Sequence, residues 1–202
     1  MPPKRRRKQK KRKQKSGRSV HKSQIPDRVS IHQRPKKINQ RKEFGHWEAD
    51  SVEGKRKVKA NSLHTEVERI SRKIKAVKVK NLTSQEALKA QIKIFEVEPE
   101  QAVKSTTLDN GKETHLHYQL RPKFNMQTYH ADPYSSWQRG TNEHGNWHIR
   151  YYFPKGTDFS NISNQELQAV VEEINNRPRK ILGYRTANEV YYQLLQHEIN
   201  EV

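Results

Sequence analysis

Cysteine is absent from this 202-residue chain, and no stretch is apolar over the ~18 residues that a membrane-spanning helix requires. Without cysteine the chain has no disulfide framework and no thiolate metal site, which is typical of a reducing cell interior. The segment after Met1 continues as lysine and arginine and lacks the hydrophobic region of a secretory signal. The sequence therefore predicts a cytoplasmic protein without a membrane segment.

Apolar and acidic residues are also scarce. Only 31% of the residues are apolar, and 41 Lys and Arg stand against 22 Asp and Glu, a net charge of +19. Residues 1–44 hold 18 of the basic residues but only Asp27 and Glu43 as acids. A cationic arm ahead of a nearly neutral domain is typical of a protein with a polyanionic partner, because Lys and Arg displace counterions from phosphates. Nucleic acid is the first candidate partner, and an anionic membrane surface is the second.

The composition changes near Gly45. Residues 2–18 contain 11 Lys and Arg and no acid, a density of like charge that predicts disorder. Residues 19–44 contain Pro26 and Pro35, which favour an extended strap over a helix. We therefore expect a basic, largely disordered arm and strap over residues 1–44 and a folded domain over residues 45–202.

Within that domain the hydrophobic patterns alternate between strands and helices. Strands are predicted over residues 46–54, 62–70, 73–81, 102–109 and 126–131, and the first three are expected to pair antiparallel. One helix is predicted after Thr83, which forms a capping box with Glu86, and others over residues 141–152, 162–178 and 188–199. This order indicates a mixed α/β fold.

Three acids occupy positions where chemistry is expected. Asp50 lies within the first strand, Asp109 ends the fourth strand before the turn residues Asn110 and Gly111, and Glu143 lies near the start of a helix. Ligands of α/β sheets gather outside strand ends, and converging carboxylates repel one another unless a cation lies between them. Mg²⁺ and Mn²⁺ prefer oxygen ligands and stabilise phosphoryl displacement. Together with the cationic arm, the acids predict an enzyme that cuts or joins phosphodiesters.

Two histidine features have simpler interpretations. His115 and His117 suggest a zinc site, but without cysteine or a second ligand pair the evidence for zinc is weak. His46 and Glu48 share the strand face of Asp50, where they could support it, although packing is the simpler role.

The amino-acid sequences of several segments resemble, in order and spacing, segments from the integrase core of transposases of the insertion-sequence-thirty family. These segments are RVSIHQRPKKINQRKEFGHWEADSVEGK, TLDNGKE, ADPYSSWQRGTNE, YYFPKGTDFS and NNRPRKILGYRTANEV, within roughly residues 24–193. The resemblance implies a ribonuclease H-like fold of the retroviral integrase type, with a mixed sheet flanked by helices. It also implies that Asp50, Asp109 and Glu143 form a DDE triad that binds Mg²⁺ or Mn²⁺ and catalyses the reaction.

The resemblance further implies nicking of DNA at element ends and transfer of the freed 3′-OH to target DNA, by a homo-oligomer associated with the nucleoid. The residues predicted to contact DNA are Lys4, Arg5, Arg6, Arg7, Lys8, Lys10, Lys11, Arg12, Lys13, Arg139, Arg150 and Lys155.

This chain also departs from the family pattern. Members of the family carry helix-turn-helix segments ahead of the core, and here only the basic arm is expected in that place. The family usually has Phe at the position of His130, and a small and an aliphatic residue at Trp147 and His148. The alternative function is therefore that of a truncated, catalytically impaired remnant that acts only as a basic nucleic-acid-binding protein.

Overall fold

The computed structural model describes residues 25–55 and 62–200. A five-stranded sheet with the order β3-β2-β1-β4-β5 forms its centre. The strands are β1 (His46–Glu53), β2 (Ser62–Glu68), β3 (Ile74–Val79), β4 (Ser105–Leu108) and β5 (Gln127–His130). The helices are α1 (Lys36–Asn39), α2 (Ser84–Phe95), α3 (Leu120–Phe124), α4 (Gly140–Tyr152), α5 (Asn164–Asn175) and α6 (Ala187–Asn200).

The sheet is mixed, as expected. β1, β2 and β3 pair antiparallel in chain order, which confirms that prediction. The chain then crosses over through α2 and returns as β4, which pairs parallel with β1, and β5 pairs parallel with β4. β4 is shorter than predicted because Pro99 precedes a 3₁₀ turn at Glu100–Ala102, and the strand begins only after that turn.

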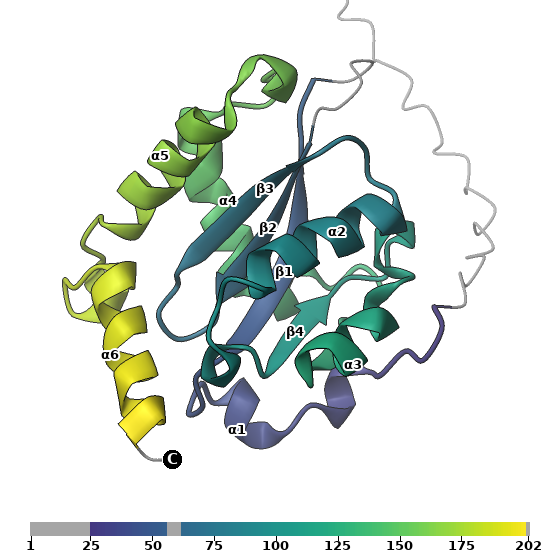
Figure 1. The fold of residues 1–202 in the computed structure, drawn as a ribbon, viewed down its shortest axis with the longest axis vertical. Coiled ribbons are helices and arrows are strands. Elements are labelled where there is room, and N and C mark those ends of the chain that lie inside the picture. The colour runs from purple at the N-terminus through teal and green to yellow at the C-terminus, as the bar shows by residue number, and fades with distance from the viewer. Residues whose placement is uncertain (1–24, 56–61, 201–202) are drawn as a thin grey trace, which may run out of the picture.

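Helices cover both faces of the sheet (Figure 1), and each face has its own hydrophobic core. Because side chains alternate along a strand, Trp47 and Val52 of β1 point to opposite faces. The first core lies between the sheet and helices α4 and α5, and the second lies under α2 and α6. The first includes Val52, Leu63, Val67, Ile74, Ile149, Phe153, Leu167 and Val171, and the second includes Phe44, Trp47, Leu88, Phe95, Leu120 and Tyr191.

The helix signals in the sequence work as expected. The Thr83 side chain accepts a hydrogen bond from the Glu86 backbone N–H at the start of α2, and Ser163 does the same for Glu166 at the start of α5. Such caps satisfy backbone N–H groups that have no partner within the helix. No helix among residues 25–55 and 62–200 has the length and apolar character needed to cross a membrane.

Residues 25–44, here called the strap, depart from the sequence-based expectation. An extended segment was predicted, but Ile31–Gln33 forms a 3₁₀ turn and Lys36–Asn39 forms the short helix α1. Pro35 immediately precedes α1, where its missing N–H removes no helical hydrogen bond, so this proline starts a helix. Four apolar side chains fix the strap to the domain by burial, namely Ile25, Ile31, Ile38 and Phe44.

The strap also pairs with the last strand of the sheet. Ser30 forms a parallel bridge with His130 of β5, and the His130 N–H donates to the Val29 carbonyl at 2.8 Å. The strap therefore lies along the β5 side of the sheet. Figure 1 shows its purple ribbon passing below α3.

Candidate active site

Asp50 and Asp109 lie level with each other on neighbouring strands. β1 and β4 run parallel with Glu48 opposite Thr107, so two residues further along each strand the register brings Asp50 beside Asp109. Asp109 directly follows the last residue of β4, where the chain turns away. The two carboxylates thus meet at the carboxyl end of β4, which is where α/β sheets commonly bind ligands.

Each of these carboxylates is oriented by hydrogen bonds. Asp109 Oδ1 accepts from the Gly111 N–H at 2.9 Å, the bond that the Asp-Asn-Gly turn favours. Asp50 Oδ1 accepts from its neighbour Ser51 N–H at 2.9 Å, and Asp50 Oδ2 accepts from Asn146 Nδ2 of α4 at 3.1 Å. Both side chains keep about a third of their surface exposed, 32% for Asp50 and 33% for Asp109, so their oxygens remain accessible.

The buried side chain of Arg139 is the counter-ion shared by both acids. Its Nη1 lies 3.3 Å from Asp50 Oδ1 and its Nη2 lies 3.8 Å from Asp109 Oδ2. Nη1 also donates to the Ala49 carbonyl at 2.6 Å, which fixes the guanidinium against β1. Arg139 was predicted to contact DNA; its side chain lies between the two acids, and DNA contact by this residue stays a prediction.

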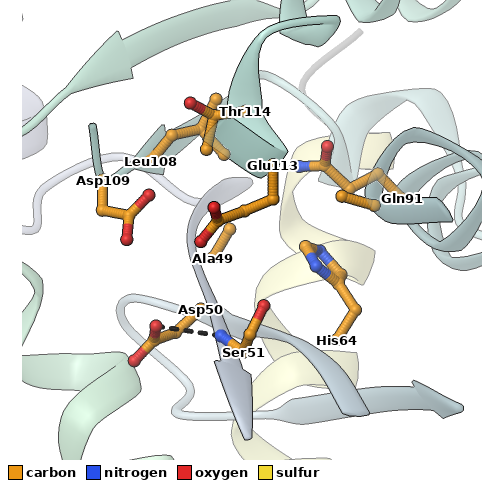
Figure 2. Close-up of a pocket in the computed structure, with 10 residues that line it drawn as sticks. Ala49, Asp50, Ser51, His64, Gln91, Leu108, Asp109, Glu113 and Thr114 are labelled. Carbon is orange, nitrogen blue, oxygen red and sulfur yellow. Dashed lines mark hydrogen bonds between the residues drawn. The ribbon is translucent and has the colours of Figure 1, made fainter. Parts of the chain in front are cut away.

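Glu113 is a third acid at this site, and the sequence analysis did not identify it. It lies in the 3₁₀ turn Lys112–Thr114 and lines a pocket together with Asp50, Asp109 and His64 (Figure 2). Figure 2 shows its carboxyl group pointing toward that of Asp109. Burial raises the pKa of Glu113, and the negative charges of Asp109 and Asp50 raise it further. The only sequence signal was its position four residues after Asp109 in the segment TLDNGKE.

Glu143 has a different setting from the other two predicted acids. It is exposed near the start of α4 and does not line the pocket. Its helix nevertheless reaches the site through Asn146, three residues on, which bonds Asp50. Within residues 25–55 and 62–200, no three or more His, Cys, Asp or Glu side chains are arranged to hold a metal ion. The convergence of Glu143 with Asp50 and Asp109 stays a prediction.

Comparison with known proteins shows that this chain is similar to transposases. The chain is 39% identical over 172 residues to the transposase of insertion sequence element IS1086 from Cupriavidus metallidurans, a match that covers 85% of this chain and 50% of that protein. It is 38% identical over 166 residues to transposase InsI of element IS30A from Escherichia coli strain K12, covering 82% of this chain and 43% of that protein. Over this region the chain is similar to transposases of the insertion-sequence-thirty (IS30) family, as the resemblance in its sequence predicts.

The chain spans about half the length of the IS30-family relatives it matches. No family model matches the sequence. The fold is similar to the crystal structure of the catalytic core domain of BIV integrase, with a TM-score of 0.59 at 16% identity, covering 77% of this chain and 98% of that one. That similarity confirms the expected ribonuclease H-like fold of the integrase type.

The side chains at this site have the chemistry, but among the described residues not the arrangement, of a site for a hard divalent cation. Asp50, Asp109 and Glu113 offer carboxylate oxygens, the ligand type that Mg²⁺ and Mn²⁺ prefer. Burial raises the pKa of Glu113 most, the charges of Asp109 and Asp50 raise it further, and the charge of Arg139 lowers it. Among these four groups the acids outnumber the arginine three to one. An additional cation would relieve that imbalance.

The residues predicted to bind DNA fall into two groups. Those of the arm, Lys4 to Lys13, lie outside the described residues. Arg150 donates from Nη2 to the Glu53 carbonyl at 2.6 Å, a bond that ties α4 to the end of β1. Lys155 is exposed in the loop that follows α4. Trp147, within α4, is also exposed.

Proposed function

We propose that this chain is the catalytic core of a DNA transposase that uses bound Mg²⁺ or Mn²⁺ to nick DNA at element ends and transfer the freed strand to a target. The observation that carries the proposal is the level placement of Asp50 and Asp109 on parallel strands, in a chain that shares 39% identity with a transposase. Two oriented, accessible carboxylates beside a surplus of negative charge are suited to binding a divalent cation.

Each residue has a distinct role in this proposal. Asp50 and Asp109 would hold the metal, and Glu143 would complete the ligand set from α4. When bound, the metal supplies charge stabilisation for the attacking and leaving oxygens of the phosphodiester. Asn146 orients Asp50 through its hydrogen bond, and Arg139 keeps the two Asp side chains together through its paired contacts.

The partners follow from the charge distribution. The basic residues of the arm, from Lys4 to Lys13, would contact phosphates of the element ends and the target, because clustered Lys and Arg bind DNA through counterion release. We further propose that the active form is a homo-oligomer at the nucleoid, since two element ends must be brought together with one target.

A plasmid-nicking assay with Mg²⁺ tests the enzyme. We expect Asp109→Asn to reduce nicking at least about a hundredfold, because losing a carboxylate ligand removes several kcal/mol of transition-state stabilisation. Asp27→Asn is the matched control: it makes the same chemical change in the strap, at a φ of 49° that Asn tolerates well. Its nicking should equal that of the wild type.

The same samples address the alternative function. If the wild type and Asp109→Asn nick equally, or neither nicks while both are folded, the chain is not a nuclease of this kind. DNA binding that weakens steeply with salt and is lost on deletion of residues 1–18 would then support a basic nucleic-acid-binding protein.

A further inference from the structure

Helix α4 begins without a cap of its own. Its N-cap residue, Arg139, makes no side-chain hydrogen bond to the helix, because its guanidinium is directed at Asp50 and Asp109. The first four N–H groups of a helix have no partner within it and need one elsewhere when they are buried. Thr141 and Asn142, in the first turn of α4, are buried, so their N–H groups require acceptors from another element.

Glu48 of β1 supplies these acceptors. Its Oε2 accepts from the Thr141 N–H at 2.8 Å and from the Asn142 N–H at 3.1 Å, and its Oε1 accepts from Thr141 Oγ1 at 3.1 Å. These N–H groups are the second and third of the helix, the ones that a capping side chain normally bonds. A carboxylate is especially favourable there because it interacts with the positive end of the helix dipole.

The buried charge of Glu48 is compensated. Glu48 is 1% exposed, and Arg69 Nε donates to its Oε1 at 2.8 Å. Arg69 also donates to the Ile38 carbonyl in the strap, and Arg41 donates to Thr141 Oγ1 at 2.9 Å. Both oxygens of the Glu48 carboxylate are therefore bonded, and the carboxylate joins β1 to α4 and, through Arg69 in the turn after β2, to the strap.

Side chains of α4 also donate hydrogen bonds to β1 and β2. Asn142 Nδ2 donates to the backbone carbonyls of Glu48 and Thr65, the latter at 3.2 Å. One turn later, Asn146 donates to Asp50. Of the three predicted metal ligands, Asp50 lies two residues after Glu48, and Glu143 lies one residue after Asn142. The Glu48 side chain thus connects the strand that carries Asp50 to the helical turn that carries Glu143.

We propose that Glu48 is a positioning residue that fixes the first turn of α4 on β1 and so sets where Glu143 lies relative to Asp50. The proposal rests on the function proposed above. It assigns Glu48 no contact with DNA or metal, and its whole effect passes through the helix start.

The test uses the full chain in three variants. Glu48→Gln replaces one of the two accepting oxygens with an amide that cannot accept. Glu68→Gln is the matched control, because Glu68 is equally buried in the neighbouring strand, accepts from backbone N–H groups of Ile70 and Ser71, and bonds no residue of α4. Glu143→Gln tests the proposed function itself. The readouts are amide hydrogen exchange along α4 and Mn²⁺ binding by calorimetry.

In Glu48→Gln we expect exchange at Thr141 and Asn142 to quicken at least about tenfold, because each loses a bond to a charged acceptor. The Mn²⁺ concentration for half-saturation should rise about tenfold, the usual effect of losing a group that orients a ligand. Glu68→Gln should change neither. If Glu48→Gln does not fold, Glu48→Asp keeps the charge beside Arg69 but withdraws the carboxylate by one methylene, and the same two readouts decide.

The outcomes are distinguishable. Unchanged exchange at Thr141 and Asn142 would overturn the proposal, and so would faster exchange with unchanged Mn²⁺ binding, since Glu48 would then be merely structural. If Glu143→Gln binds Mn²⁺ as the wild type does, the proposed function fails at Glu143. The exchange data would in that case still decide whether Glu48 holds the helix.

Discussion

Replacing His130 should make the protein less sensitive to acid. His130 is completely buried in β5, and neither of its ring nitrogens has a hydrogen-bond partner. Burial, and then the neighbouring His117, whose ring centroid lies 4.4 Å away, lower the pKa of His130 from 6.5 to about 3. The folded state therefore binds a proton on this ring much more weakly than the unfolded chain does.

The sign and size of the effect follow from that difference. Because the pKa of His130 is lower in the folded state, its contribution to stability is fully present above pH 6.5 and is lost as the pH falls toward 3. Between about pH 7 and about pH 4.5 the loss should be about 2.5 kcal/mol, since each pH unit below the ordinary pKa costs about 1.4 kcal/mol. This figure requires only that the folded pKa of His130 lies below about 4.

Urea unfolding of the wild type and of His130→Phe at both pH values measures the pH-dependent contribution of His130 to the free energy of unfolding. Any packing change caused by the larger ring is present at both pH values and cancels in the comparison, as does the titration of histidines that do not contact His130. The stability difference between variant and wild type should shift by about 2.5 kcal/mol in favour of the variant on acidification. A difference that is the same at both pH values would refute the reasoning.

Two further predictions concern packing. A Cβ on Gly145 would lie 2.8 Å from Val67 Cγ2, so Gly145→Val should destabilise the protein by about 1–3 kcal/mol in urea unfolding, whereas Gly140→Ala, with nothing within 4 Å, should not destabilise it. Equal stabilities would mean that α4 is not held closely against β2. Trp47→Phe should cost about 1–3 kcal/mol in the same assay, because the Trp47 Nε1–H donates to the buried Ala102 carbonyl at 2.7 Å and Phe leaves that carbonyl without its partner. A neutral result would show that solvent or another donor replaces the bond.

Local patterns made much of the fold predictable. The alternation of Trp47 and Ala49 against Glu48 and Asp50 identified β1 and its two faces, and Thr83 marked the start of α2. These signals depend on residues close together in the sequence. The prolines of the strap predict an extended segment, but packing of the strap against the domain stabilises short helical turns instead.

The site was predictable only in part, because its remaining contacts join residues that are distant in the sequence. Asp50 and Asp109 were singled out from their places in strands, and the parallel register brings them together. The bridging position of Arg139 depends on where α4 packs, which no local pattern encodes. Likewise, Glu48 meets the N–H of Thr141 across 93 residues of chain.

The pairing of the strap with β5 has a consequence for where this protein can be shortened. β5 is a terminal strand of the sheet, and exposed terminal strands recruit strands from other molecules and promote aggregation. Val29 and Ser30 occupy part of that rim through their contacts with His130. A version trimmed to begin at Gly45 would lose the backbone contacts that cover part of β5 and would also lose the buried isoleucines of the strap. A soluble catalytic fragment should therefore retain the chain from Ile25 onward.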